Sequence, residues 1–164
     1  MPEFFIKQLA QGIKEKFHNE SVEKEHRLYV DKTIRAHAPA LFEQFAQVLG
    51  RYVDQLREDL GNGVLATDLS FQRTGSMISI DKPELPFVKF TARLELERHE
   101  IDMAYVTRSP KPSPQENPGL TDLVVSLNVG PQDSVSMQLP DGTAIYRVEK
   151  LAESIMQKLF TLKS

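Results

Sequence analysis

The chain has 164 residues, no cysteine, a formal net charge of −3 and a pI near 5.8. Without cysteine there is no disulfide framework, thiolate nucleophile or thiolate metal site, and no run of Lys or Arg exceeds two residues, which argues against nucleic-acid binding. No signal-peptide pattern and no apolar run of about 20 residues is present, so we expect a cytoplasmic protein that does not enter a membrane.

The N-terminal third predicts three amphipathic helices. Residues 3–18 repeat apolar side chains at helical spacing, and Asn19-Glu20-Ser21 interrupts the pattern. Ser21 is placed to cap a second helix, 21–37. The alternative for part of this stretch is a strand over residues 27–34, but Lys32 interrupts its alternation, so the sequence favours a helix.

A third helix is predicted from Pro39 to Leu60. Proline is disfavoured inside a helix and suits its first position, so we expect the chain to restart at Pro39. Gly61 follows where a glycine usually ends a helix. The apolar positions between these limits give the clearest amphipathic signal in the chain, which predicts a helix that packs on the core.

An antiparallel sheet of about six strands, arranged as a hairpin-rich meander, is predicted next. The longest strand signal is 87–99, where apolar and polar side chains alternate. Three hairpins match apolar with apolar residues: a turn at Thr74-Gly75 pairs Phe71 with Ile78 and Leu69 with Ile80; a turn at His99-Glu100 pairs Leu96 with Met103 and Leu94 with Tyr105; the loop Gly130–Ser134 pairs Val129 with Val135, Leu127 with Met137 and Val125 with Leu139. The second turn has a wider alternative that includes Arg98 and Ile101, because two-residue turns favour Asn-Gly.

The C-terminal part predicts one long helix. Its apolar stripe runs from Val148 to Leu159, and it begins either at Thr143 or after a short strand that ends near Arg147. Before it, residues 109–119 hold four prolines and almost no apolar residue. We expect a solvated loop there, with a proline-motif docking site for a partner as the alternative.

These elements predict one α+β domain over residues 1–164, with the helices layered on one face of the sheet. Two or three helices suffice to cover six strands, so one helix is in excess. We expect the first helix, residues 1–20, to be peripheral and to serve a homo-oligomer contact or a protein partner. It carries Phe4, Phe5, Ile6, Ile13 and Phe17. The alternative is that it lies across the other helices.

One cluster of residues could carry chemistry. Glu95, Glu97 and His99 fall on one face of the predicted strand, and the expected register places Glu97 opposite Asp102. Such a group could hold a metal ion or form an acid/base pair, or Arg93, Arg98 or Lys89 could neutralise it. No phosphate loop, nucleophile elbow or HExxH motif occurs, so no catalytic residue and no cofactor site is predicted.

Three classes of function follow. The first is a non-catalytic binding or assembly module, because the chain has a complete fold and no recognisable reaction centre. The second is a carrier of a small apolar ligand: the order of elements over residues 27–162 resembles the helix-grip layout of START and Bet v1-like proteins, which enclose apolar ligands between sheet and helix. The unbroken helix from Pro39 to Leu60 departs from that layout, where two shorter helices are usual. The third is a metal-dependent or acid/base hydrolase that uses the Glu95, Glu97 and His99 face.

Overall fold

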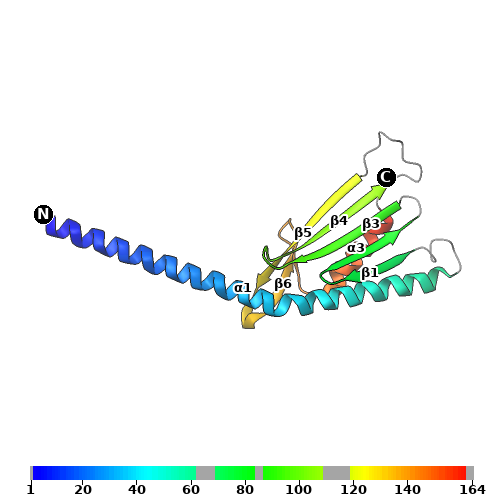
Figure 1. The fold of residues 1–164 in the computed structure, drawn as a ribbon, viewed down its shortest axis with the longest axis horizontal. Coiled ribbons are helices and arrows are strands. Elements are labelled where there is room, and N and C mark those ends of the chain that lie inside the picture. Colours follow the sequence, from blue (N-terminus) through cyan, green and yellow to red (C-terminus); the bar gives the residue numbers. More distant parts are fainter. Residues whose placement is uncertain (1, 62–68, 84–86, 109–118, 162–164) are drawn as a thin grey trace.

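A computed structural model describes residues 2–61, 69–83, 87–108 and 119–161 (Figure 1). They form one very long helix, an antiparallel sheet and a C-terminal helix. The elements are α1 (Pro2–Leu60), β1 (Ser70–Thr74), β2 (Met77–Lys82), β3 (Phe87–Glu95), β4 (Glu100–Arg108), β5 (Gly119–Val129), the short 3₁₀ turn η1 (Pro131–Asp133), β6 (Val135–Gln138), β7 (Ala144–Ile145) and α3 (Val148–Thr161). Most of the proline-rich loop, 109–118, lies outside the described residues.

The prediction of three N-terminal helices is wrong, because α1 is a single helix of 59 residues. Ser21 does not begin a new helix, and residues 27–34 are helical, as favoured. Asn19-Glu20-Ser21 contains neither glycine nor proline, and residues of these types lower helix propensity by only a few tenths of a kcal/mol each. They are therefore too weak a signal to end the helix.

Pro39 lies inside α1 rather than at the start of a helix. It has no N–H for the carbonyl of Arg35 and disfavours a continuous helix by about 3 kcal/mol. Burial on both sides offsets that cost: Ala38 before the proline and Phe42 after it are each 1% exposed. Tertiary packing therefore overrides the local breaker, while Pro39 itself faces solvent.

The end of α1 confirms the predicted glycine. Gly61 has φ +69, in the left-handed region, and its N–H donates to the carbonyl of Glu58 at 3.1 Å. Glycine reaches this conformation without the steric cost that a Cβ would add.

The sheet is a meander of seven strands, one more than expected, in the order β1-β2-β3-β4-β5-β6-β7. Every neighbouring pair is antiparallel, as predicted. The additional strand is β7, a two-residue strand before α3. The second of the two predicted starts for the last helix is therefore the correct one.

Two of the three predicted registers are wrong by two residues, and the third is correct over the described pairs. Phe71 lies opposite Ile80 because the first turn is at Gly75-Ser76. Leu94 lies opposite Ile101 because the second turn spans residues 96–99, and this turn is wider than a two-residue one, although Ile101 remains in β4. The hairpin of β5 and β6 has Val129 opposite Val135 and Leu127 opposite Met137, while β6 ends before Leu139. A slip of two keeps each side chain on its face, so the predicted faces survive.

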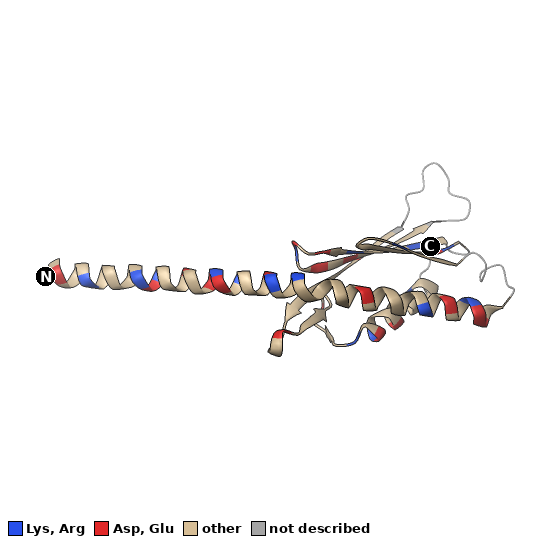
Figure 2. Cartoon of the chain, turned by 60° about the horizontal axis from the view of Figure 1, so that its bottom comes forward, with Lys and Arg blue, Asp and Glu red and all other residues tan. Residues whose placement is uncertain are grey.

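The two helices cover one face of the sheet (Figure 2). Alternate side chains of β2, β3 and β4 are buried and contact apolar side chains of α1 and α3 in one cluster. The buried core includes Ile34, Phe42, Phe45, Leu49 and Val53 of α1, Ile80, Phe90, Met103 and Tyr105 of the sheet, and Leu151, Ile155 and Leu159 of α3. This is a two-layer α+β architecture whose second sheet face is open.

Lys82 is the one lysine buried among the described residues of this core, at 4% exposure. Its Nζ donates to the carbonyl of Leu159 at 3.2 Å, in the last turn of α3. Burial lowers the pKa of the Lys82 amine. The carbonyls at the end of α3 form the negative end of its dipole, so the cation has a structural role at that helix terminus.

Candidate functional site: the projecting helix and its junction

Residues 2–28 of α1, the projecting segment, extend away from the sheet and α3 (Figure 1). Every one of these residues is exposed to solvent. The first buried residues of α1 are Thr33 and Ile34. The prediction that the N-terminal helix is peripheral is therefore confirmed for its position, and almost half of α1 contacts nothing in the described part of the chain.

The projecting segment carries an apolar stripe, defined here as Phe5, Ile6, Leu9, Ile13 and Phe17. Their exposed fractions are 62%, 57%, 50%, 47% and 65%. The spacing of three and four places these side chains along one side of the helix. Phe4 and Val22 are exposed as well but point to the opposite side. Folded proteins rarely leave a contiguous row of large apolar side chains in water without a use for it.

One face of α1 runs through three zones of different chemistry. At 3.6 residues per turn, the stripe continues into a charged zone and then into the core-facing zone. The charged zone is Glu20, Lys24, Arg27 and Asp31, and the core-facing zone is Ile34, Ala38, Phe42, Phe45, Leu49 and Val53. Figure 2 shows acidic and basic residues along this part of the helix. The charged zone separates the stripe from the core, so the domain's own sheet does not cover the stripe.

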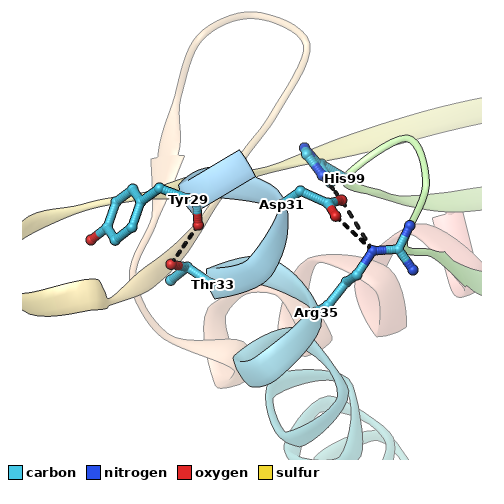
Figure 3. Close-up of polar contacts among 5 residues, drawn as sticks. All are labelled: Tyr29, Asp31, Thr33, Arg35 and His99. Atoms are coloured by element: carbon cyan, nitrogen blue, oxygen red, sulfur yellow. Dashed lines mark hydrogen bonds and ion pairs between the residues drawn. The ribbon is translucent and has the colours of Figure 1, made fainter. Parts of the chain in front are cut away.

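The junction between the projecting segment and the domain is held by an ionic contact from the sheet. His99 Nε2 lies 2.9 Å from Oδ1 of Asp31, and Arg35 Nε donates to Oδ2 of the same carboxylate at 2.9 Å (Figure 3). Both contacts lower the pKa of Asp31, the His99 contact more strongly. His99 is in the turn between β3 and β4 with φ 53, so a strained backbone directs its ring toward α1.

A second turn contacts α1 one helical position away. The hydroxyl of Tyr29 donates to Asp133 in η1, between β5 and β6, and the hydroxyl of Thr33 donates to the carbonyl of Tyr29 at 2.8 Å. The Asp133 contact raises the pKa of Tyr29. Asp133 also has a positive φ, 59. Two hairpin tips with strained backbones therefore fix the point where α1 leaves the domain.

The predicted acid and histidine cluster is divided between two places. β3 ends at Glu95, so Glu97 and His99 belong to the turn and not to a strand face. Arg93, rather than Glu97, lies opposite Asp102. His99 contacts Asp31, and Glu97 lies beside it at the edge of an open hollow of about 840 Å³ along α1, lined by Lys24, His26, Arg27, Leu28, Val30, Asp31, Glu97 and His99.

Glu95 and Asp102 lie on the open face of the sheet, where Arg98 neutralises them. Its guanidinium lies 2.7 Å from Asp102, 3.1 Å from Glu100 and 3.8 Å from Glu95. Burial, followed by the hydrogen bond with Asp102, raises the pKa of Glu100. Glu95 and Glu100 are directly opposite each other in the hairpin, a repulsive pairing that the arginine offsets. Among the described residues, no three His, Asp or Glu side chains converge in a way that could hold a metal ion.

A second open hollow, of about 880 Å³, lies between α1, β1 and the start of α3. Glu43 and Arg73 form an ion pair across it, and Arg51 and Asp54 line it further along α1. Gly50 allows the ring of Phe71 to approach, because a Cβ there would lie 3.3 Å from the ring. Charges of both signs alternate along this surface, so it does not select one charge type of ligand.

Sequence reasoning missed Asp31 and Asp133, because their partners are 68 and 104 residues away in the chain. It considered Arg98 as one of three cations and did not distinguish among them. The continuity of the face from Ile6 to Val53 was visible in the sequence as an unbroken 3.6-residue period. That period was the signal that could have identified both the single helix and its charged zone.

No family model, no curated protein and no solved structure matches the chain. None of the described helices has a segment long and apolar enough to cross a lipid bilayer.

Proposed function

We propose that this protein is a non-catalytic assembly module, and that the apolar stripe of its projecting segment is the binding element. The observation that carries the proposal is the exposure of five large apolar side chains along one side of a helix that the domain holds away from itself. Covering such a row would remove it from water at a gain of about 25 cal/mol for each Å².

The junction supports this proposal. His99 and Asp133 contact α1 at Asp31 and Tyr29, close to the point where its burial begins. A helix anchored there presents the stripe in a fixed direction, so less conformational entropy is lost when a partner binds. The contacts at the former candidate residues are the ion pairs of such an anchor and of a solvated sheet face, and they leave no acid or base facing an enclosed cleft.

The absence of cysteine provides a direct test. Ala10→Cys places a thiol beside the stripe, and Gln8→Cys places one on the opposite side of the same helix turn. Both positions are exposed in the isolated chain, so both should react with a maleimide at similar rates in dilute purified protein. In cells that produce the protein at its native level, we expect Cys at position 10 to react at least about tenfold more slowly, since a bound partner covers it.

Equal labelling of the two variants in cells would overturn the proposal, because the stripe would then be free where the protein works. Labelling after unfolding in urea is the control for intrinsic thiol reactivity. Ala10→Cys is preferred to a substitution of Ile13 because it adds a small side chain and leaves all five apolar residues of the stripe in place.

A further inference from the structure

We infer that the occupant of the apolar stripe is the same stripe of a second copy of this chain, with the two α1 helices running antiparallel. This inference rests on the proposed function and names its partner. A two-fold pairing of identical surfaces is the commonest form of a closed assembly. The argument has three parts: the geometry of α1, the area of the stripe and the charges that flank it.

The geometry excludes the parallel arrangement. The stripe and the core-facing zone lie on the same face of α1, from Ile6 to Val53. In a parallel pair, the partner helix would continue along this face beyond residue 30 and occupy the space that the sheet and α3 already fill. In an antiparallel pair the partner helix runs the other way, past residue 2. The two domains then lie at opposite ends, separated by roughly 60 Å at 1.5 Å per residue.

The area of the stripe matches a small specific interface. A phenylalanine buries about 150–250 Å² when fully covered, and the five side chains of the stripe are each about half exposed. Pairing two stripes would therefore remove on the order of 1,000 Å² from water, which is about the lower limit for a specific protein interface. The helix is already formed as an extension of α1, so little ordering entropy opposes the association.

Charge favours the same answer. A parallel pair would place Glu20 against Glu20 and Lys24 against Lys24 at the centre of the interface. In the antiparallel pair these residues lie beyond the end of the partner's stripe, in solvent. The charges within residues 2–17 are Glu3, Lys7, Lys14, Glu15 and Lys16. This near balance is unlike the Lys- and Arg-rich polar face of helices that lie on anionic membranes, so a protein surface fits better than a lipid surface.

Sedimentation of the purified full-length chain tests the pairing. We expect a reversible dimer at tens of micromolar, and Ile13→Glu should shift the chain to a monomer with an unchanged circular dichroism spectrum. Val22→Glu is the matched control, because Val22 is as exposed as Ile13, at 50% against 47%, but lies on the opposite side of the helix. Its dimer should persist. A wild-type chain that stays monomeric at 100 µM, or a dimer that Ile13→Glu leaves intact, overturns the inference.

The orientation is tested by spin labels on Ser21→Cys. If the stripes overlap near residue 10, the two labels in an antiparallel pair are roughly 30 Å apart along the axis at 1.5 Å per residue. A dimer with labels closer than about 20 Å is parallel and overturns the inference. Flotation of wild-type protein with vesicles of phosphatidylcholine and phosphatidylserine, lost in Ile13→Glu, would overturn it in favour of a lipid surface.

The two proposals can fail separately. A monomeric purified chain whose Ala10→Cys is still protected in cells overturns the second copy and leaves the assembly function, with another protein as partner. An unprotected Ala10→Cys in cells overturns both.

Discussion

His99 and Asp31 join two segments that are 68 residues apart, with Nε2 of the imidazole 2.9 Å from Oδ1 of the carboxylate. The contact lies where α1 changes from exposed to buried, and Arg35 binds the same carboxylate (Figure 3). The residue that was predicted to be a metal ligand is therefore part of a contact between the sheet and the long helix. Its effect should be on the direction and order of the projecting segment.

Removal of the imidazole should loosen the junction without unfolding the domain. In His99→Asn the shorter amide loses the contact with Asp31, while asparagine tolerates the positive φ at this position better than other residues. We expect faster hydrogen exchange at amides 24–33 and a nearly unchanged melting temperature, because exposed ion pairs contribute little to global stability. His26→Asn is the control, since His26 is exposed and should alter neither measurement. Unchanged exchange in His99→Asn would show that other contacts fix the junction.

The Asp31 contact should weaken in acid. The His99 hydrogen bond, followed by that of Arg35, holds the pKa of Asp31 below its ordinary value. A carboxyl whose pKa is lower in the folded state stabilises that state above its unfolded pKa of about 3.9, and the contribution is lost as the pH falls through the folded pKa. The melting temperatures of wild type and Asp31→Asn should therefore differ at pH 6 and converge toward pH 3. A difference that stays constant over this range would mean that Asp31 acts through something other than its charge.

Arg98 should be required only when the carboxylates around it are ionised. Arg98→Met keeps an apolar stem but leaves Glu95, Glu100 and Asp102 without their shared cation. The pKa of Glu100 is already raised, and a raised carboxyl pKa gives stability that is present below the unfolded value and lost as the pH rises. We expect the variant to melt earlier than wild type at pH 7 and at nearly the same temperature near pH 4. Arg93→Met, which removes one contact of 3.9 Å to Glu95, should have a smaller effect.

The internal proline of α1 should lower stability. Pro39→Ala restores an N–H for the carbonyl of Arg35 and removes a helix breaker, which favours the helix by about 3 kcal/mol in other proteins, offset by up to about 1 kcal/mol because alanine frees the unfolded chain. We expect the free energy of unfolding in urea to rise by about 1–2 kcal/mol. Pro2→Ala is the control, because Pro2 is the first residue of α1, where no N–H is needed. A less stable Pro39→Ala would indicate that the core is packed around a bend at the proline.

The fold was predictable where local chemistry and packing agree. Gly61 ends a helix, the hairpin from Val125 to Met137 has its predicted register, and α3 follows a short strand. The continuous helix was not predictable from local signals, since Pro39 is a breaker whose cost only tertiary burial offsets. Two registers failed because alternation fixes the face of a strand, whereas the length of the turn fixes the pairing. Of the candidate site, sequence gave the residues but not their partners, which come from distant elements.

Leu9 and Leu49 provide the closest comparison between the two apolar zones of α1. Both are leucines on the same face of the same helix, yet Leu9 is 50% exposed and Leu49 is fully buried. Leu49→Ala should lower the free energy of unfolding by about 2–5 kcal/mol, because it opens a cavity against the sheet. Leu9→Ala should change it by less than about 0.5 kcal/mol when measured in dilute solution, where the chain is a monomer. In concentrated solution Leu9→Ala should instead weaken self-association, while Leu49→Ala at a temperature where it remains folded should not. If Leu9→Ala destabilised the monomer as much as Leu49→Ala, the projecting segment would fold back on the domain, and the stripe would belong to the core after all.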